Sequence, residues 1–198
     1  MLKLQSVSFS YEKKKVLDNF SMHLEDGEIL AVMGPSGCGK STLLSLIAGL
    51  KKPDAGQIVS THSRTAFVFQ EPRLFPWLTV RENLLAPLEK SHRNEDEIEA
   101  ALDTVMLPST ADLYPDELSG GMKSRVALAR ALLFGGDLYL LDEPFASLDE
   151  ELRQTLADRL HSHIKESGAS AIFVTHQTSD AARIADRTLT LTALPASN

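Results

Sequence analysis

A glycine-rich segment between two apolar stretches constrains this chain more than any other feature. Residues 34–42 have the sequence GPSGCGKST, in which a glycine, four residues, a glycine, a lysine and a serine follow one another. The apolar run Glu28–Met33 predicts a buried strand before it, and Leu43–Ala48 predicts a helix after it that ends near Gly49. A strand, a glycine-rich loop and a helix in this order are typical of a site for nucleoside triphosphate, whereas a chance glycine turn would lack these flanks.

Each residue type in this loop has a physical role in holding phosphate. Glycines let the backbone wrap closely with its N–H groups turned inward, and the N-terminus of the following helix adds partial positive charge. Lys40 neutralises phosphate charge, and Ser41 can offer its hydroxyl to a Mg²⁺ ion that bridges the phosphates. The predicted nucleotide-binding residues are Gly34, Pro35, Ser36, Gly37, Cys38, Gly39, Lys40, Ser41 and Thr42.

Composition limits the other possibilities. At 198 residues, with 43% hydrophobic and 24% charged side chains, the chain is predicted to form one soluble domain with a smaller subdomain. The formal charge of −7 argues against a nucleic-acid partner, because a phosphate backbone has to be met by clustered lysine and arginine. The start of the chain has no basic segment followed by an apolar run, so we expect no signal peptide. No apolar run approaches the roughly 18 residues that span a bilayer.

The only cysteine, Cys38, lies inside the glycine-rich loop. No disulfide can form within the chain, which suits a reducing, cytoplasmic compartment. We read Cys38 as a small filler residue without a role in catalysis. Because it lies in the loop near a helix N-terminus, where the dipole favours the thiolate, a bulky thiol reagent on it is still expected to block nucleotide binding.

Two strands are predicted before the loop, at Leu2–Phe9 and Phe20–Leu24. Tyr11 is expected on the loop between them. An aromatic ring beside a nucleotide site can stack on a base, although a single exposed tyrosine is more often ordinary surface.

Two short strands follow the first helix, at Gln57–Val59 and Ala66–Phe69, and Gln70 ends the second of them. The next segment, Glu71–Leu78, mixes prolines with large apolar side chains, so it is either a loop packed under the domain or a surface that binds a partner. A capping box then opens a helix, and the stretch from Trp77 to Leu118 is predicted to be a small, mostly helical insertion.

The last part of the chain alternates predicted strands and helices. The strand Asp137–Glu143 ends in two carboxylates, and the strand Ala171–Thr175 is followed by His176. Two other histidines, His161 and His163, have no comparable placement and are expected on the surface. The other predicted elements are a helix at Glu150–Gly168, a helix at Thr178–Ala185 and a strand at Arg187–Leu191.

The polar groups at the ends of these strands match the needs of a Mg-nucleotide site. Acidic residues at the carboxyl end of a strand lie where α/β sheets bind ligands. Asp142 fits the role of holding Mg²⁺, usually through water, and Glu143 fits that of orienting the attacking water. His176 can contact the γ-phosphate or the water and stabilise charge on the phosphoryl oxygens. The alternative is that these are unrelated surface acids and a buried histidine.

The segment Leu118–Met122, with the sequence LSGGM, resembles the signature motif of the ATP-binding cassette ATPases. Ser119 and the N–H groups of Gly120 and Gly121 at a helix start form an anion site, although a lone Ser-Gly-Gly would be an ordinary cap. The family's other motifs match in order: Tyr11 its aromatic residue, Gln70 its glutamine loop, Leu138–Glu143 its second acidic motif, Ser147-Leu148-Asp149 its D-loop and His176 its switch histidine.

This resemblance covers about the full chain and implies ATP hydrolysis by an α/β fold with the RecA-like core of the phosphate-loop NTPases. The implied core comprises residues 1–76 and 119–198, with an antiparallel β portion near the N-terminus, and the implied α-helical subdomain is residues 77–118. It further implies a head-to-tail dimer, in the simplest case of two copies, in which ATP lies between the phosphate loop of one protomer and the signature motif of the other. Tyr11 would then stack on adenine. The implied metal residues are Ser41, Gln70 and Asp142, and the implied catalytic residues are Lys40, Gln70, Glu143 and His176.

Within that family, the segment 69–83, together with Met122 and Lys123, is most similar to ATPase subunits of nitrate, sulfonate and taurine importers. Such a subunit implies a transmembrane permease as partner and an extracytoplasmic solute-binding protein in the same system. It also implies a cytoplasmic location on the inner face of the membrane. Because selectivity lies in those partners, the transported solute cannot be read from this chain.

Three departures from the family pattern stand out. The segment between the phosphate loop and Gln70 is short, Ser124 stands where glutamine is usual, and Gln177 stands where aspartate is usual. The chain also ends soon after His176, so we expect no C-terminal regulatory domain.

The alternatives to transport are a cassette ATPase that acts on DNA, a phosphate-loop kinase for a small molecule, and a nucleotide-binding regulatory module without turnover.

Overall fold

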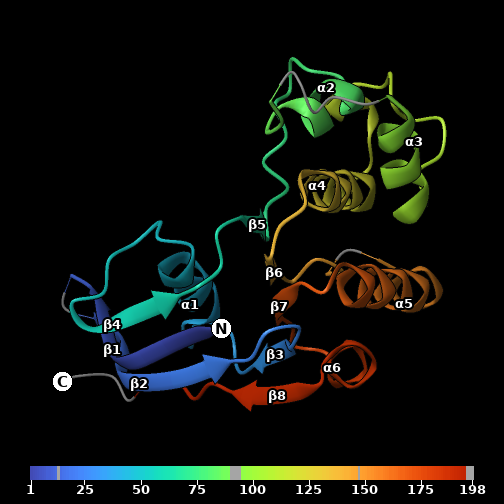
Figure 1. The fold of residues 1–198 in the computed structure, drawn as a ribbon. Helices are drawn as coiled ribbons and strands as arrows, with labels where there is room; N and C mark the ends of the chain where they lie inside the picture. Colours follow the sequence, from blue (N-terminus) through green and yellow to red (C-terminus); the bar gives the residue numbers. More distant parts are fainter. Residues whose placement is uncertain (13, 90–94, 147, 195–198) are drawn as a thin grey trace.

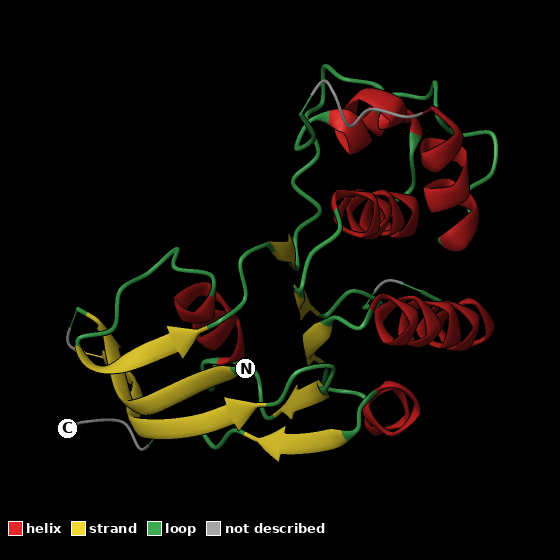
Figure 2. Cartoon of the chain, in the orientation of Figure 1, coloured by secondary structure: helices red, strands yellow, loops and turns green. Residues whose placement is uncertain are grey.

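The computed structural model describes residues 1–12, 14–89, 95–146 and 148–194, and Figures 1 and 2 show how their strands and helices are arranged. The strands are β1 (Leu2–Tyr11), β2 (Lys14–Leu24), β3 (Ile29–Met33), β4 (Ala55–Ser60), β5 (Thr65–Val68), β6 (Leu138–Asp142), β7 (Ser170–Val174) and β8 (Arg187–Thr190). The helices are α1 (Lys40–Ile47), α2 (Val80–Leu85), α3 (Glu95–Thr104), α4 (Gly120–Phe134), α5 (Glu150–Ser167) and α6 (Thr178–Ile184), with a short 3-10 helix at Pro115–Glu117.

A five-stranded parallel sheet lies at the centre of the fold, in the order β5-β6-β7-β3-β8. Its three middle strands are continuous apolar runs because helices or a second sheet cover each of its faces. The predicted α/β fold is confirmed, and the predicted strands and helices all form. Most lie within a few residues of their expected bounds, but β2 begins at Lys14, well before the expected start at Phe20.

Alternate residues of the middle strands enter two different hydrophobic clusters. In β3, Ile29 and Ala31 belong to a cluster shared with helices α2 to α6, whereas Leu30 and Val32 belong to one shared with α1 and the antiparallel sheet. Figure 1 shows α4, α5 and α6 on one side of the parallel sheet and α1 on the other. Val80 of α2 lies in the first cluster, so the helical segment packs onto the same core as the sheet.

The smaller sheet is antiparallel, in the order β2-β1-β4. Gly56 allows β4 to approach β1 closely, since a Cβ atom there would lie 2.3 Å from the carbonyl oxygen of Ser6. Tyr11 is the last residue of β1 and pairs with Lys14, so the prediction that it lies on a loop was wrong. The strand continues past Phe9 because its pairing with β2 extends through Ser10 and Tyr11.

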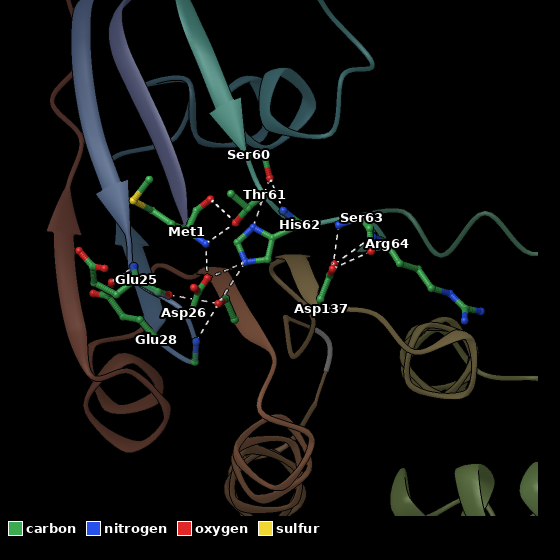
Figure 3. A network of polar contacts seen from close by, with 12 residues as sticks. Met1, Glu25, Asp26, Glu28, Ser60, Thr61, His62, Ser63, Arg64 and Asp137 are labelled. Carbon is green, nitrogen blue, oxygen red and sulfur yellow. Dashed lines mark hydrogen bonds and ion pairs between the residues drawn. The ribbon is translucent and has the colours of Figure 1, made fainter.

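A polar network joins the two sheets where β4 leads into β5 (Figure 3). The imidazole of His62 lies at its centre, with only 5% of the side chain exposed. His62 Nδ1 is 3.2 Å from Ser60 Oγ, and His62 Nε2 is 3.3 Å from Ser170 Oγ at the start of β7. Next to it, the carboxylate of Asp137 accepts hydrogen bonds from the backbone of Ser63 and Arg64 at 2.7 and 2.9 Å. One short segment therefore ties the antiparallel sheet to two strands of the parallel one.

His161 and His163 of α5 were predicted to be ordinary surface residues. Both are half-buried instead. The ring of His163 packs edge-on against the buried Tyr139 ring, with 3.4 Å between His163 Nε2 and the Tyr139 hydroxyl. Burial lowers the pKa of His163, and the charge of Glu166 opposes this shift. Within the described ranges, none of the helices is long and apolar enough to cross a membrane.

Candidate functional site

Neighbouring parallel strands bring the predicted site residues to one edge of the sheet. Asp142, the last residue of β6, pairs with Val174, the last residue of β7. β7 in turn pairs with β3, which leads directly into Gly34. The glycine-rich loop, the carboxylates of Asp142 and Glu143, and His176 therefore follow three adjacent strands at their carboxyl ends, which is the ligand-binding edge of parallel α/β sheets.

Two glycines of the loop have backbone conformations that a side chain would disturb. Gly34 has a φ of 148°, and a Cβ atom there would lie 2.3 Å from the carbonyl oxygen of Leu191. Gly39 has a φ of 106° and caps α1. The ammonium of Lys40 reaches back over the loop and donates to the carbonyl oxygens of Gly34 and Pro35 at 2.8 and 3.0 Å. The loop therefore curls around the lysine at the N-terminus of α1.

The thiol of Cys38 lies away from the open side of the loop. Its side chain is only 3% exposed and belongs to the hydrophobic cluster shared by α1 and the antiparallel sheet. Its sulfur lies close behind Gly34. The structure therefore does not bring the Cys38 thiol to the open side of the loop, and only the backbone of Cys38 is placed there.

A cleft of about 300 Å³ opens beside the loop. Its walls come from the end of β1, the start of α1, the segment after β5 and the residue after β6. The predicted residues that line it are Tyr11, Ser36, Gly37, Gly39, Lys40, Ser41, Thr42, Gln70 and Glu143.

A second hollow of about 510 Å³ adjoins this cleft through two shared residues, Ser41 and Gln70. Asp142 also lines it, so the three predicted metal residues surround one space. Their hydroxyl, amide and carboxylate oxygens are hard ligands of the kind that Mg²⁺ accepts beside phosphate and water. In the described part of the chain, no group of three or more His, Cys, Asp or Glu side chains could hold a metal by itself. This chemistry fits Mg²⁺ that is bound together with a nucleotide.

Asp142 is a buried carboxylate without full charge compensation. Its side chain is among the buried polar groups of the chain, with 5% exposure. Burial raises the pKa of Asp142, a hydrogen bond from Ser41 opposes the rise, Glu143 adds to it, and Lys40 opposes it. A cation next to this carboxylate would therefore stabilise its charged form.

Glu143 and His176 form a direct pair. Glu143 Oε2 lies 2.9 Å from His176 Nδ1, and the glutamate side chain is 17% exposed whereas the histidine is 55% exposed. Glu143 has a φ of 49°, in the left-handed region that is uncommon for a non-glycine residue. Its backbone N–H donates to the carbonyl oxygen of Val174 at 3.0 Å, which fixes this turn against β7. The carboxylate thus faces the cleft in an orientation set by two neighbouring strands.

Tyr11 stands at the rim of the cleft with its ring partly supported. The ring of Phe9 meets it edge-on with centroids 5.0 Å apart, and the Tyr11 hydroxyl is 3.4 Å from Thr42 Oγ1. The ammonium of Lys51 lies 4.7 Å from the ring centroid. A supported aromatic ring at the rim is suited to stacking on a base.

The signature segment lies apart from these hollows, since Ser119, Gly120 and Gly121 are not among the residues that line them. Ser119 caps α4, with its hydroxyl accepting a hydrogen bond from the N–H of Met122 at 3.2 Å. The hydroxyl of Ser124, which stands where glutamine is usual in the family pattern, donates to the carbonyl oxygen of Gly120 at 3.2 Å. Ser147 of the predicted D-loop lies outside the described residues, while Asp149 caps α5.

Asn83 is a structural residue that the sequence patterns did not single out. It is fully buried, and its side-chain oxygen accepts from the N–H of Phe75 at 2.8 Å. Its amide nitrogen donates to the carbonyl oxygens of Phe75, Leu78 and Thr79. These bonds fix the segment Glu71–Leu78, which we call the apolar loop. In this loop Phe75 is 41% exposed and Trp77 is 70% exposed. An asparagine at a buried helical position would have been the signal for this role.

Comparisons with known proteins agree with this geometry. Residues 17–146 match the family described as ABC transporter. The chain is 42% identical over 189 residues to the aliphatic sulfonates import ATP-binding protein SsuB of Bacillus cereus, with 91% of this chain and 75% of that protein covered. It is 40% identical to the sulfate/thiosulfate import ATP-binding protein CysA of Pseudomonas aeruginosa, covering 94% of this chain and 62% of that protein. It is 42% identical to the nitrate import ATP-binding protein NrtC of Synechococcus elongatus, covering 91% of this chain but 29% of that protein.

Solved structures show the same fold. A dimeric structure of MJ0796, described as a bacterial ABC transporter cassette, has a TM-score of 0.90 and 30% identity, with 97% of this chain and 94% of that chain covered. A dimeric post-hydrolysis state of MJ0796 bound to ADP and Pi has a TM-score of 0.87 and 29% identity, with 96% and 94% covered.

Proposed function

The chain belongs to the ABC transporter family and is an ATP-binding, ATP-hydrolysing cassette, and from this premise we propose that it energises an importer of a small solute such as nitrate, a sulfonate or taurine. The import proteins for sulfonates, sulfate or thiosulfate, and nitrate that share 40–42% of its residues support this solute class. Family membership leaves the small-molecule kinase without support. The observation that carries the proposed ATP chemistry is the Glu143–His176 pair, next to Asp142 and the phosphate loop.

The cleft would hold ATP with its adenine on Tyr11 and its phosphates in the loop. Lys40 and the N–H groups at the start of α1 would meet the phosphate charge. Ser41, Gln70 and Asp142 would hold Mg²⁺, which supplies charge neutralisation on the phosphate oxygens. The charged form of Asp142, which burial disfavours, gains a partner in this arrangement.

Glu143 would orient the attacking water by accepting a hydrogen bond from it. His176 Nδ1 fixes one carboxylate oxygen of Glu143, so the other oxygen is left to face the cleft. The exposed part of the His176 ring can contact the γ-phosphate and stabilise negative charge there. The chain thereby supplies positioning and electrostatics, which are the main needs of phosphoryl transfer.

In a head-to-tail dimer, the signature segment would bind the γ-phosphate of the ATP that the phosphate loop of a second copy holds. The residues that would bind it are Ser119, Gly120 and Gly121. Their exposure at the N-terminus of α4, outside the chain's own hollows, supports this role. The MJ0796 cassettes of the same fold are dimers.

The apolar loop with Phe75 and Trp77 would contact a transmembrane permease on the cytoplasmic face of the membrane, and an extracytoplasmic solute-binding protein would deliver the solute. We assign residues 77–118 to a helical subdomain and residues 1–76 and 119–198 to the ATPase core. Two exposed aromatic rings 5.7 Å apart, held out by a buried asparagine, support a contact surface at this loop.

Glu143→Gln tests the proposed chemistry, because the amide keeps the shape of the side chain and removes its charge. We expect turnover to fall by at least about 100-fold, the scale of a positioned general base, while ATP and Mg²⁺ still bind. Uncleaved ATP should then hold the head-to-tail dimer together. The measurements are a phosphate-release assay and size-exclusion chromatography with Mg-ATP.

The matched control is Glu71→Gln, at an acid that lines the second hollow but does not contact His176. Its turnover should stay close to that of the unchanged protein. Near-normal hydrolysis by Glu143→Gln would remove Glu143 from the mechanism. Lost hydrolysis without an ATP-dependent dimer would leave Glu143 in place and contradict dimer formation by the isolated subunit.

A further inference from the structure

Arg130 connects the helix that follows the signature segment to the loop that carries Gln70. It lies about three turns along α4 from Ser119. Its Nη2 donates to the carbonyl oxygen of Pro72 at 2.9 Å, and its Nη1 donates to that of Arg73 at 3.1 Å. The planar guanidinium thus donates hydrogen bonds to two successive carbonyl groups shortly after Gln70.

In the part of the chain that the structure describes, the Arg130 guanidinium donates only to these two carbonyl groups. The side chain is half-buried, and burial lowers the pKa of its guanidinium. Across the described residues no carboxylate pairs with it. Leaving a half-buried cation without its carbonyl partners is costly, so the hydrogen bonds of Arg130 to the loop have to be retained.

The loop that these bonds hold has a conformation that needs support. Arg73 has a φ of 47°, in the left-handed region that a residue with a Cβ atom seldom adopts. The Arg73 guanidinium stacks over the Phe69 ring at 3.9 Å, on the other side of Gln70 in sequence. Gln70 therefore lies in a short bend that is fixed at Phe69 by stacking and at Pro72 and Arg73 by Arg130.

We propose that Arg130 is a positioning residue that holds Gln70 within reach of the metal-bound nucleotide and ties this loop to the signature helix. The proposal rests on the metal role of Gln70 proposed above. Arg130 is not among the residues that line the two hollows, and its effect is on where the Gln70 amide stands beside Ser41 and Asp142.

Arg130→Lys tests this role, because lysine keeps the charge but cannot span two carbonyls with a planar fork. The bond after Arg73 is a tryptic site on an exposed residue, so its cleavage rate reports how firmly the loop is held. We expect cleavage after Arg73 to become roughly 3- to 10-fold faster. The Mg²⁺ concentration for half-maximal ATPase activity should rise roughly threefold or more, because Gln70 is less well placed.

The matched control is Arg125→Lys. Arg125 lies on the same helix and also donates to two backbone carbonyls, those of Val105 and Met106, at the end of α3. It should lower the melting temperature as Arg130→Lys does, while the Arg73 cleavage rate and the Mg²⁺ midpoint stay unchanged.

The outcomes separate this inference from the role of Gln70. Unchanged cleavage after Arg73 in Arg130→Lys, or equal changes in Arg125→Lys, would overturn it. Faster cleavage with an unmoved Mg²⁺ midpoint would also overturn it, provided that Gln70→Ala shifts the midpoint. If Gln70→Ala leaves the midpoint unmoved, the metal role of Gln70 fails, and cleavage after Arg73 alone decides whether Arg130 holds the loop.

Discussion

Asp142 and Glu143 are adjacent carboxylates with different surroundings. Asp142 ends a buried strand and is 5% exposed, whereas Glu143 turns out of the strand in a left-handed conformation and pairs with His176. The burial of Asp142 disfavours its ionised form until a cation is present. The turn and the His176 contact of Glu143 orient its carboxylate toward the cleft. Two neighbouring residues can therefore serve metal binding and water orientation.

The raised pKa of Asp142 leads to a prediction about stability. Because its folded-state pKa lies above the unfolded value, the folded protein binds more protons in that range, and stability falls as pH rises through it. At neutral pH, without nucleotide and metal, the Asp142 charge is therefore destabilising. Asp142→Asn should raise the melting temperature of the metal-free protein and abolish ATP turnover.

Differential scanning calorimetry without Mg²⁺ and with excess chelator measures the first effect, and a phosphate-release assay measures the second. Ser41→Ala is the matched control, since it removes a partner of Asp142 and leaves the buried charge in place. A lower melting temperature for Asp142→Asn would show that the ionised carboxylate stabilises the fold.

At the residue level, sequence reasoning placed the chemistry better than the supporting contacts. Asp142, Glu143 and His176 could be predicted to lie together because each follows a buried parallel strand. The inward side chain of Cys38 could not, because loop spacing does not say which way a side chain points. The partners of Asn83 and Arg130 are backbone carbonyl groups, and a sequence does not show which carbonyl groups a side chain will meet.

At the scale of elements, the segment 60–64 links the antiparallel sheet to the parallel one. Ser170 Oγ, which contacts His62, also accepts from the N–H of Gly27 and donates to the carbonyl oxygen of Glu25. The turn before β3, the start of β7 and the segment before β5 therefore meet at one buried imidazole (Figure 3).

His62 makes this junction sensitive to acid. Burial lowers its pKa, the positively charged N-terminus acts in the same direction, and Asp137 and Asp26 oppose them. With a folded-state pKa below the unfolded value of 6.5, the unfolded chain binds more protons as the solution is acidified. The stability supplied by neutral His62 is complete above that value and is lost as pH falls through the unfolded and then the folded pKa.

His62→Gln should therefore flatten the pH dependence of unfolding, because glutamine keeps a polar group and does not titrate. Urea unfolding at pH 7.5 and pH 5.5 measures the difference in free energy. Ser60→Ala keeps the imidazole and should lower stability at both pH values while retaining the acid loss. An equal acid loss in His62→Gln and the unchanged protein would place the sensitive group elsewhere, for example at His163.

The element types were predictable because strands and helices here have clear apolar periods, but the junction was not. Its members are single polar residues from segments far apart in sequence, and only the register of the two sheets brings them together. Tyr11 shows the same limit, since pairing with Lys14 extends β1 beyond the apolar pattern.

At the scale of the whole molecule, ATP chemistry and the proposed permease contact are linked by one short segment. Gln70 lines the hollows beside the loop, and Phe75 and Trp77 stand exposed a few residues later. Arg130 and Asn83 hold this segment from α4 and α2. A change at the nucleotide can therefore reach the exposed rings through a short run of residues.

Trp77→Glu tests whether those rings bind the permease. The side chain is 70% exposed, so the charge should leave the fold and the ATPase activity of the isolated subunit nearly unchanged. At an interface, a buried tryptophan is typically worth about 2 kcal/mol or more, so affinity for the permease should fall by roughly 30-fold or more. Co-purification of the subunit with its co-expressed permease, beside turnover of the isolated subunit, measures the two effects.

Val59→Glu is the matched control, because Val59 is also an exposed apolar residue, 45% exposed, but lies on the edge strand β4. It should keep both turnover and co-purification, since no contact is proposed there. If Trp77→Glu loses turnover as well, Trp77 supports the fold. If it keeps both properties, the permease binds elsewhere, and the exposed rings that Asn83 holds out need another partner.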